Sequence, residues 1–485
     1  MYPYPDIPRA RIAELHHQAE RGAPAIPIRR ARRARTDRFG PATPALALAA
    51  RAAYILRDNS TGLITKAAPS LYPHQWSWDA AFNAIGLATV DLPRARLELD
   101  SLFAGQWRNG MVPHIVFDPA ANGYWPGPGQ WQSARFSEES PARPATSGIC
   151  QPPVHAIAVD KILAAAARAG GREEELTRGW AAHLYPGLLA WHRFLARDRA
   201  DKATGLMTLF HGWESGTDNS PRWDAPYANV VPGAGLPAYI RKDTAHVASP
   251  AQRPTDGDYD RYLQLVEEAR QAGFDAGLLR ELGSFQVGDV LFTAIFAAAC
   301  DLLAALAGRL RKPDDADELA DYAAQARAAV FCHVDEATGL AADVDLRTGE
   351  WLRTETIAGF APLIAGRMPG AMRRRLVALL AGPRWAGHPG LRWALPPSTS
   401  PCAPAFDPQC YWRGPVWPFF TWLLTWALRR CGETAAAGRL RSASLNQLSD
   451  GTLAEYYHPI TGAPLGSPSQ SWTAATALDW LLDQE

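Results

Sequence analysis

The sequence lacks a surplus of charge of either sign. Lysine plus arginine and aspartate plus glutamate each number 49 among 485 residues, so no overall field attracts nucleic acid or an anionic membrane. The one strong charge run is Arg29, Arg30, Arg32, Arg33 and Arg35. A basic tail without neighbouring aromatics is usually a solvated arm, and a nucleic-acid-binding arm is the alternative. We expect a partner that is small or uncharged overall, with no nucleic acid and no membrane.

Cysteine is scarce, and long apolar runs are missing near the start of the chain. The six cysteines have neither CxxC spacing nor the density of a disulfide-stapled secreted domain, so we expect reduced, mostly buried thiols. The first 40 residues contain no continuous apolar stretch of the signal-peptide kind, and we find no later stretch long enough to span a bilayer. A cytoplasmic location follows by default.

Several motifs of metal and cofactor chemistry are also missing. The twelve histidines show no HExxH motif and no clustered ligand spacing. There is no phosphate-binding Walker loop, and Gly127-Pro128-Gly129 lacks the rest of a dinucleotide fingerprint. No Gly-x-Ser-x-Gly elbow is present. We therefore expect no metal and no cofactor.

Alanine and leucine at helical spacing dominate the chain, whereas long β-branched alternation is scarce. Helices spread over the whole length favour hairpins packed in a ring or stack over a parallel sheet. No composition break marks a second domain, so we predict a basic arm over residues 1–43 and one all-α domain over 44–485. The predicted helices cover residues 44–59, 92–107, 153–169, 179–197, 259–272, 285–310, 314–332, 371–380, 416–431 and 471–483.

Two long segments rich in proline, glycine and tryptophan separate these helices, at residues 118–151 and 223–258. Such loops in a compact domain tend to be functional covers. Many of the eighteen tryptophans lie outside the helices, next to polar residues. Flat apolar rings beside polar groups suit a sugar, which has CH-rich faces and a rim of hydroxyls. For any single tryptophan, filling the core is the simpler interpretation.

Residues 212–223 are too polar for a core and too aromatic for a solvated loop. Glycoside cleavage needs one carboxyl that stays protonated near neutral pH and a second that is ionised. Asp218 lies close in sequence to Trp213 and Trp223, so desolvation would raise its pKa. Glu214 is the local alternative, unless it serves only as an ion-pair partner of Arg222.

A second polar and aromatic segment, LAEYYHP, occupies residues 453–459. Its Glu455 is a candidate for the ionised carboxylate. Taken alone, a glutamate before two tyrosines is more often a surface residue than a catalytic one.

Several motifs together resemble glycoside hydrolase family 63 and its barrel-only relatives that hydrolyse glucosylglycerate or mannosylglycerate. The resemblance covers about residues 45–483 and implies an (α/α)6 barrel with long active-site loops. It also implies that Asp218 is the general acid, that Glu455 is the general base, and that the anomeric configuration is inverted. The motifs are LYPHQWSWD (71–79), GQWRNGMVPH (105–114), ESGTDNSPR (214–222), RPTD (253–256), YWRGPVWP (411–418) and the Glu455 segment.

The same resemblance assigns substrate contacts. Arg253 is the informative one, because a carboxylate-bearing aglycone suits a guanidinium fork. The cleaved sugar is expected to meet Tyr72, Trp76, Trp78, Asp79, Tyr124, Gln151, Trp213 and Trp417. The glycerate half is expected to meet Arg253, Tyr259, Tyr411, Trp412 and Gln470.

The sequence thus predicts an inverting α-glycosidase acting on glucosylglycerate first and mannosylglycerate second. An α-glucosidase acting on small oligosaccharides is the rival among enzymes. A sugar-binding protein without turnover and a helical scaffold are the rivals from other classes. The sequence leaves open whether the protein is a homo-oligomer.

Overall fold

The computed structural model describes residues 43–121 and 124–482, and residues Pro44–Glu485 form one compact unit. The predicted basic arm, with its five arginines, lies outside the described residues. Every helix and strand of the described residues belongs to the unit that begins at Pro44.

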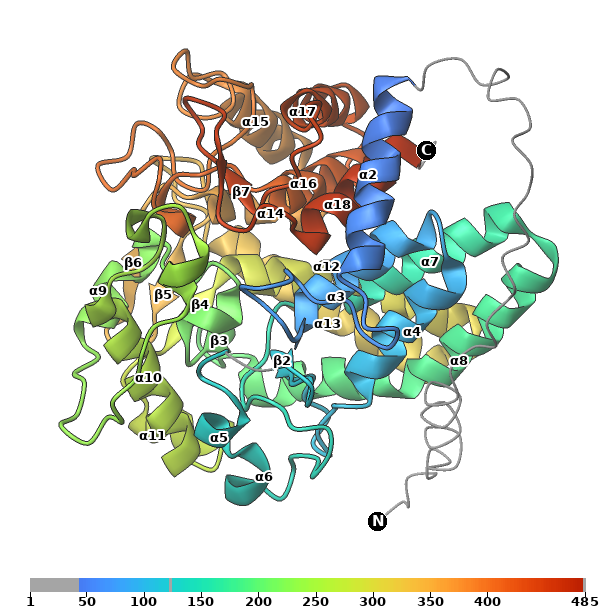
Figure 1. Cartoon of the computed structure of the whole chain (residues 1–485). Coiled ribbons are helices and arrows are strands. Elements are labelled where there is room, and N and C mark those ends of the chain that lie inside the picture. Colours follow the sequence, from blue (N-terminus) through green and yellow to red (C-terminus); the bar gives the residue numbers. More distant parts are fainter. Residues whose placement is uncertain (1–42, 122–123, 483–485) are drawn as a thin grey trace, which may run out of the picture. The chain divides into compact units, whose positions relative to one another are not determined.

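Six helices form a closed inner ring (Figure 1). Each packs against the next, and the last, α18, packs against the first, α3. In ring order the helices are α3 (Ser77–Ala88), α7 (His155–Ala169), α12 (Val290–Arg309), α14 (Ala361–Ala365), α16 (Pro418–Arg430) and α18 (Ser471–Leu482).

Outer helices pack against this ring and alternate with it along the chain. Helices α2, α4, α8, α13 and α17 contact α18, α3, α7, α12 and α16, respectively, while α15 follows α14 in the sequence. This is the predicted (α/α)6 barrel. The outer helices are α2 (Pro44–Asp58), α4 (Leu92–Phe103), α8 (Gly171–Phe194), α13 (Pro313–Cys332), α15 (Gly370–Ala381) and α17 (Thr434–Gln447).

Inner and outer helices differ in how much of their surface is apolar and buried. Outer helix α2 buries one stripe, with Leu48, Ala52 and Ile55 at helical spacing, as expected for an amphipathic helix. In contrast, every residue of inner helix α3 is buried. A Cβ built on Gly86 of α3 would lie 2.3 Å from Cα of Ala475 in α18, so glycine permits this close helix contact.

Short strands lie where inner helices begin. Strand β1 runs into α3, and β4 runs into α12. All pairings are antiparallel: β1 with β2, β3-β4-β5-β6 in order, and β7 with β8. The strands are β1 (Gln75–Trp76), β2 (Ile115–Val116), β3 (Met207–Leu209), β4 (Val287–Asp289), β5 (Asp343–Asp345), β6 (Glu350–Leu352), β7 (Tyr456–Tyr457) and β8 (Pro464–Leu465).

The two predicted cover segments contain only short helices before α10 begins. The α-helices outside the two rings are α5 (Pro128–Trp131), α6 (Ser133–Phe136), α9 (Asp224–Ala228), α10 (Asp256–Gln271) and α11 (Ala276–Leu282). A π-helical turn, η1 (Leu195–Arg199), extends α8, and the 3-10 turns are η2 (Gly212–Ser215), η3 (Pro221–Trp223), η4 (Asp243–His246), η5 (Pro250–Gln252), η6 (Ile357–Phe360) and η7 (Tyr411–Arg413).

Each helix predicted from the sequence is present, although α8 begins at Gly171 and not at residue 179. Three helices of the two rings were missed, α3, α14 and α17, as were the short helices α5, α6, α9 and α11. The helix predicted from residue 285 begins at Val290, because residues 287–289 form β4. We expected no stretch long enough to span a membrane, and this was wrong for α12, which is long and apolar enough by length and composition alone. That helix belongs to the inner ring, and most of its apolar stretch is buried inside the barrel.

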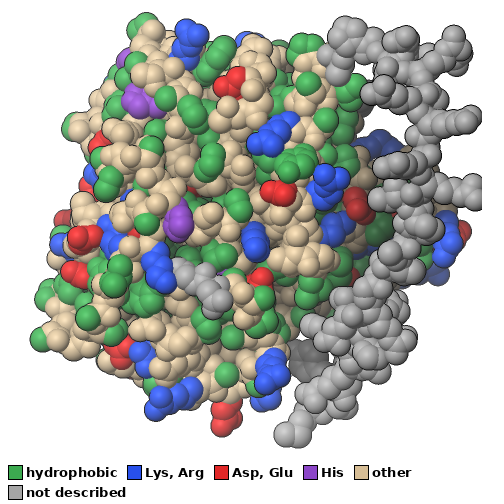
Figure 2. All heavy atoms as spheres, in the orientation of Figure 1, with side chains coloured by type: hydrophobic (Ala, Val, Ile, Leu, Met, Phe, Trp, Pro, Cys, Tyr) green, Lys and Arg blue, Asp and Glu red, His purple; other side chains and the backbone are tan. Residues whose placement is uncertain are grey.

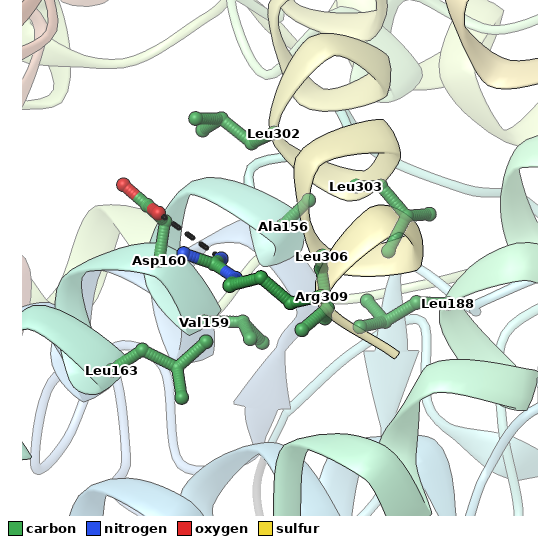
Figure 3. Close-up of a pocket in the computed structure, with 9 residues that line it drawn as sticks. All are labelled: Ala156, Val159, Asp160, Leu163, Leu188, Leu302, Leu303, Leu306 and Arg309. Carbon is green, nitrogen blue, oxygen red and sulfur yellow. Dashed lines mark ion pairs between the residues drawn. The ribbon is translucent and has the colours of Figure 1, made fainter. Parts of the chain in front are cut away.

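The thiols are free among the described residues, but they are not mostly buried as predicted. Cys150 and Cys300 are buried, Cys332 and Cys402 are exposed, and the other two are half-buried. On the face shown in Figure 2, acidic and basic side chains are interspersed, in keeping with their equal numbers. A small cavity with about 200 Å³ of empty space lies between α7, α8 and α12. It is lined mainly by leucines beside an Asp160–Arg309 ion pair of 3.8 Å (Figure 3).

Candidate active site

A larger cavity, with about 820 Å³ of empty space that is partly open to solvent, lies at the N-terminal ends of inner helices. Asp79 comes from the first turn of α3, Gln151 precedes α7, and Gln470 and Trp472 flank the start of α18. The cavity therefore gathers residues from distant parts of the chain. Twelve predicted site residues line it: Tyr72, Trp76, Trp78, Asp79, Tyr124, Gln151, Trp213, Asp218, Arg253, Tyr259, Tyr411 and Gln470.

The start of α3 is held in place by the β1–β2 pair. Trp76 pairs with Ile115, and the Ser77 N–H donates to the His114 carbonyl over 2.9 Å. This places Trp78 and Asp79 at the cavity. Burial holds the pKa of Asp79 well above its ordinary value, with a further contribution from Glu455.

Asp218 lies on the turn after η2. The turn passes through Gly216 at φ +69°, where an added Cβ would lie 2.2 Å from the Trp78 ring, so only glycine fits without displacement. The Asp218 side chain keeps part of its surface open. Burial raises its pKa to about 7, while Arg253 acts in the opposite direction and Glu455 in the same one.

Glu214, the alternative acid, is fully buried in an ion pair with Arg199, not with Arg222 as expected. Arg199 donates to its two carboxylate oxygens over 2.9 and 2.7 Å, and the Phe210 and Cys150 N–H groups donate as well. Although burial acts to raise it, these partners hold the pKa of Glu214 below its ordinary value. Glu214 is thus a compensated structural anion and does not line the cavity.

Arg222 instead joins the strands behind the site. Its guanidinium lies 2.7 Å from Asp343 of β5 and 3.2 Å from Asp289 of β4. It also donates to the Thr217 hydroxyl over 2.9 Å and covers the Trp223 ring at 4.0 Å. Arg222 therefore fixes the turn that carries Asp218.

Glu455 is fully buried just before β7 and, unlike Asp218, is not among the residues that line the cavity. Its Oε2 accepts a hydrogen bond from the Ser467 N–H over 3.1 Å, and its Oε1 accepts one from the Tyr72 hydroxyl over 2.9 Å. Burial raises its pKa, and Arg253 opposes that effect. Gly466, at φ +69°, allows the close approach, because an added Cβ would lie 2.3 Å from Oε2.

Arg253 lies between two carboxylates. Its Nε donates to Asp243 over 3.2 Å, and its Nη1 lies 3.7 Å from Oε1 of Glu455. Its guanidinium also covers the Tyr411 ring at 4.1 Å from the centroid. The guanidinium thus neutralises anions of the protein itself.

Two tyrosines connect the predicted acid and base. The Tyr72 hydroxyl, which donates to Glu455, lies 3.2 Å from the Tyr411 hydroxyl. The Tyr411 side chain also hydrogen bonds to Asp218. The two carboxyl groups, far apart in sequence, therefore belong to one hydrogen-bonded group.

Trp412 and Trp417 do not line the cavity. Their rings stack at 3.9 Å with an interplanar angle of 2°, and both are 1% exposed. Trp417 also lies edge-on to Tyr411 at 5.2 Å and stacks on Tyr456 at 4.5 Å. This pair supports Tyr411 from behind.

Lys242, Asp243 and His246 line the cavity but were not predicted from the sequence. All three belong to the segment 223–258 that was expected to act as a cover, and its charged cluster was the available signal. Trp125 and Trp472 also line the cavity. The sequence placed these two tryptophans among polar residues but assigned them no role.

Several buried polar atoms at the cavity have no hydrogen-bond partner within the described residues. They are Nη1 of Arg253, both amide atoms of Gln470, Nε1 of Trp472 and Nδ1 of His114. An unpaired buried polar group costs about 1–3 kcal/mol, so each is a ready partner for a ligand hydroxyl. Residues 43–121 and 124–482 contain no group of three or more potential metal ligands.

A cavity with aromatic walls and unpaired polar atoms, lined by Asp79 and Asp218 and backed by the buried Glu455, fits one class of protein. All three carboxyl groups have raised pKa values. Enzymes that hydrolyse glycosidic bonds use a pair of carboxyl groups, one of which must hold its proton near neutral pH.

Comparisons with known proteins agree with this class. The family model of the mannosylglycerate hydrolase MGH1-like glycoside hydrolase domain matches residues 72–473. A glucosylglycerate hydrolase of Mycolicibacterium hassiacum is 52% identical over 435 residues, covering 90% of this chain and 97% of that protein. The chain therefore belongs to the MGH1-like family of glycoside hydrolases.

Solved structures of a relative share the fold. The family 63 mannosylglycerate hydrolase from Thermus thermophilus, in complex with Tris and D-glycerate, is 40% identical with a TM-score of 0.80. The same enzyme in complex with glucose gives a TM-score of 0.78. Each comparison covers 89% of this chain and 99% of the other.

Proposed function

We propose that this enzyme hydrolyses glucosylglycerate, and mannosylglycerate as a second substrate, to the free sugar and glycerate with inversion. The M. hassiacum relative that supports this substrate is a glucosylglycerate hydrolase, and the T. thermophilus relative is a mannosylglycerate hydrolase. The observation that carries the mechanism is the hydrogen-bonded group that joins Asp218 and Glu455 through Tyr72 and Tyr411.

In this proposal Asp218 is the general acid. Its pKa of about 7 keeps a proton available near neutrality, and the carboxyl gives that proton to the glycosidic oxygen as the bond from C1 breaks. Glycerate leaves with the proton on its hydroxyl group. Arg222 and Gly216 position the turn that carries Asp218.

Glu455 is the general base. Its anionic form is favoured by the Ser467 N–H, the Tyr72 hydroxyl and the nearby Arg253 guanidinium. The carboxylate takes a proton from a water molecule whose oxygen forms the new bond to C1 on the opposite face of the sugar. The released sugar therefore has the inverted anomeric configuration.

The sugar would occupy the part of the cavity around Asp79 and Trp472. A hydrogen-bonding carboxyl and an unpaired indole N–H suit vicinal hydroxyls. Trp76, Trp78 and Trp213 supply flat apolar faces. The glycerate half would lie toward Tyr259 and Arg253.

The decisive experiment is to incubate the protein with α-glucosylglycerate and with α-mannosylglycerate and follow the products by proton NMR. We expect faster release from the glucoside, with the β-anomer of glucose appearing before mutarotation. Initial release of the α-anomer would overturn inversion. Absence of hydrolysis of both compounds would overturn the substrate assignment.

We propose that residues 44–485 constitute one catalytic domain and that the enzyme acts in the cytoplasm.

A further inference from the structure

Each turnover of the proposed mechanism leaves the two carboxyl groups in the wrong protonation states for the next one. Asp218 gives its proton to the glycosidic oxygen, and Glu455 takes a proton from the attacking water. The products therefore leave behind an ionised acid and a protonated base. Glu455 must lose a proton and Asp218 must gain one before a second substrate can be cleaved.

Glu455 has few ways to lose that proton. Its side chain is fully buried and does not line the cavity. Three polar groups lie against its carboxylate: the Tyr72 hydroxyl at 2.9 Å, the Ser467 N–H at 3.1 Å and the Arg253 guanidinium at 3.7 Å. A backbone N–H and a guanidinium only donate, whereas a hydroxyl both donates and accepts. Of these three groups, only Tyr72 can take the proton from Glu455 while it passes its own proton onward.

The Tyr72 hydroxyl leads to Asp218 through one further hydroxyl. Its oxygen lies 3.2 Å from that of Tyr411, and either hydroxyl can be the donor. The Tyr411 side chain in turn hydrogen bonds to Asp218. Burial raises the pKa of both tyrosines well above the ordinary value, so both remain neutral hydroxyls. The four side chains therefore form a continuous hydrogen-bonded chain from the base to the acid.

Tyr411 is held in this chain by the segment that carries the acid. Its backbone has φ +33°, in the left-handed region that is unfavourable for a residue with a side chain. The Asn219 side chain fixes both neighbours of Tyr411: its oxygen accepts a hydrogen bond from the Trp412 N–H over 2.9 Å, and its nitrogen donates to the Cys410 sulfur over 3.4 Å. Asn219 directly follows Asp218. Backbone strain of this kind is concentrated at functional sites, where the surrounding structure imposes it.

We propose that Tyr72 and Tyr411 form a proton relay that resets the enzyme after each turnover. The inference rests on the proposed function and deepens it. In one concerted step the Tyr411 proton passes to the Asp218 carboxylate, the Tyr72 proton passes to the Tyr411 oxygen, and the Glu455 proton passes to the Tyr72 oxygen. Three O–H bonds break and three form, so both tyrosines end as neutral hydroxyls. The net change is one proton moved from Glu455 to Asp218, and no co-reactant is needed.

The relay matters most above neutral pH, where solvent is a poor source of protons. At pH 8, hydronium ions arriving at the diffusion limit of about 10⁹–10¹⁰ M⁻¹ s⁻¹ supply roughly 10–100 protons per second. Ordinary turnover numbers are about 1–1000 s⁻¹, so this supply falls within the range of turnover itself. A direct path from the base to the acid removes that limit.

The test measures the first turnover separately from the later ones. Tyr411→Phe breaks the chain without removing a partner of Glu455. With α-glucosylglycerate at pH 8 in dilute buffer, rapid quenching should show a burst of about one glucose per active site, followed by later turnovers about tenfold slower than the first. Imidazole, a small proton carrier, should speed the later turnovers of the variant and leave its first turnover unchanged. The wild type should show no slow phase that depends on imidazole.

Two further variants complete the test. Tyr72→Phe breaks the chain at its other hydroxyl, and because the two hydroxyls act in series, the double variant should show the same ratio of later to first turnover as either single variant. Tyr185→Phe is the matched control. It also removes the hydroxyl of a buried tyrosine, but this hydroxyl bonds to Asp315 and does not line the cavity, so its ratio should equal that of the wild type.

The outcomes separate the relay from the proposed function. If Tyr411→Phe slowed the first and later turnovers equally, or kept the wild-type ratio without imidazole, solvent would perform the reset and the relay would be overturned. The proposed function would then still stand, because the wild type would hydrolyse its substrate. Failure of the wild type on every glycosylglycerate would overturn the proposed function itself.

Discussion

Glu214 and Asp218 lie four residues apart on one short segment, yet their surroundings differ in every respect that matters for chemistry. Glu214 points into the protein and is surrounded by Arg199 and two backbone N–H groups. Asp218 reaches the cavity, where burial raises its pKa to about 7. One carboxylate is an anion with its partners in place, and the other retains a proton.

The contrast extends to the regions around the two residues. Behind the cavity wall, the buried Arg199 is paired with Glu214, whose pKa lies below its ordinary value. At the cavity and just behind its wall, Asp79, Asp218 and Glu455 all have raised pKa values. The Arg199–Glu214 pair stabilises the fold through compensated charges, whereas the site concentrates carboxyl groups whose ionisation is disfavoured.

Asp218→Asn should produce the largest effect on the enzyme. Losing the proton donor should lower kcat by about a thousandfold, with little change in substrate affinity, because the acid acts mainly in the transition state. Steady-state kinetics with a glycosylglycerate measure both. A variant with near wild-type kcat would remove Asp218 from the role of acid.

Glu214→Gln should mainly lower the stability of the protein, whereas Asp218→Asn should mainly lower its activity. Removing the anion leaves Arg199 buried without its partner, which should lower the free energy of unfolding by about 3–5 kcal/mol. The midpoint of urea unfolding measures this loss, and activity per folded molecule should fall far less than in Asp218→Asn. If turnover collapsed while the midpoint stayed the same, the roles of the two carboxylates would have to be exchanged.

Arg253→Ala should lower activity on charged and neutral glucosides alike, by about 10- to 100-fold, because the variant removes the cation beside Glu455. This differs from the expectation drawn from sequence, in which Arg253 serves mainly the aglycone carboxylate. The ratio of kcat/KM for glucosylglycerate and glucosylglycerol decides between the two roles. A loss confined to the charged substrate would restore the original assignment.

The activity of the wild type should also depend on pH. Because Asp218 must be protonated to act and its pKa is about 7, kcat/KM should fall about tenfold for each pH unit well above 7. A profile of kcat/KM between pH 5 and 9 measures this fall above pH 7. A flat profile up to pH 9 would contradict the assignment of the acid.

The same pKa bears on stability. The folded state binds the Asp218 proton more tightly than the unfolded chain does, so this contribution is fully present below about pH 4 and is lost as pH rises toward 7. Asp218→Asn should therefore gain stability relative to the wild type as pH rises through that window. Thermal unfolding at pH 4, 5.5 and 7 measures the gain.

Much of the barrel could be predicted because outer helices such as α2 and α8 show an apolar stripe. Helix α3 was missed because all its residues are buried, including Asp79 and Asn83, so no polar face marks a helical period. Helix α17 was missed for the opposite reason, since alanine and polar residues give it only a weak stripe. Periodicity detects a helix only where one face meets water.

The sequence by itself determined the helical class of this protein and its richness in tryptophan. Motif resemblance predicted Asp218 and Glu455 as the acid and the base. Tertiary structure alone decided that Glu214 pairs with Arg199 and that Trp412 and Trp417 stack behind Tyr411. It also brought Lys242 to the cavity. The reason is that burial and charge compensation depend on tertiary contacts between segments that are distant in the sequence. Residue spacing along the chain does not specify those contacts.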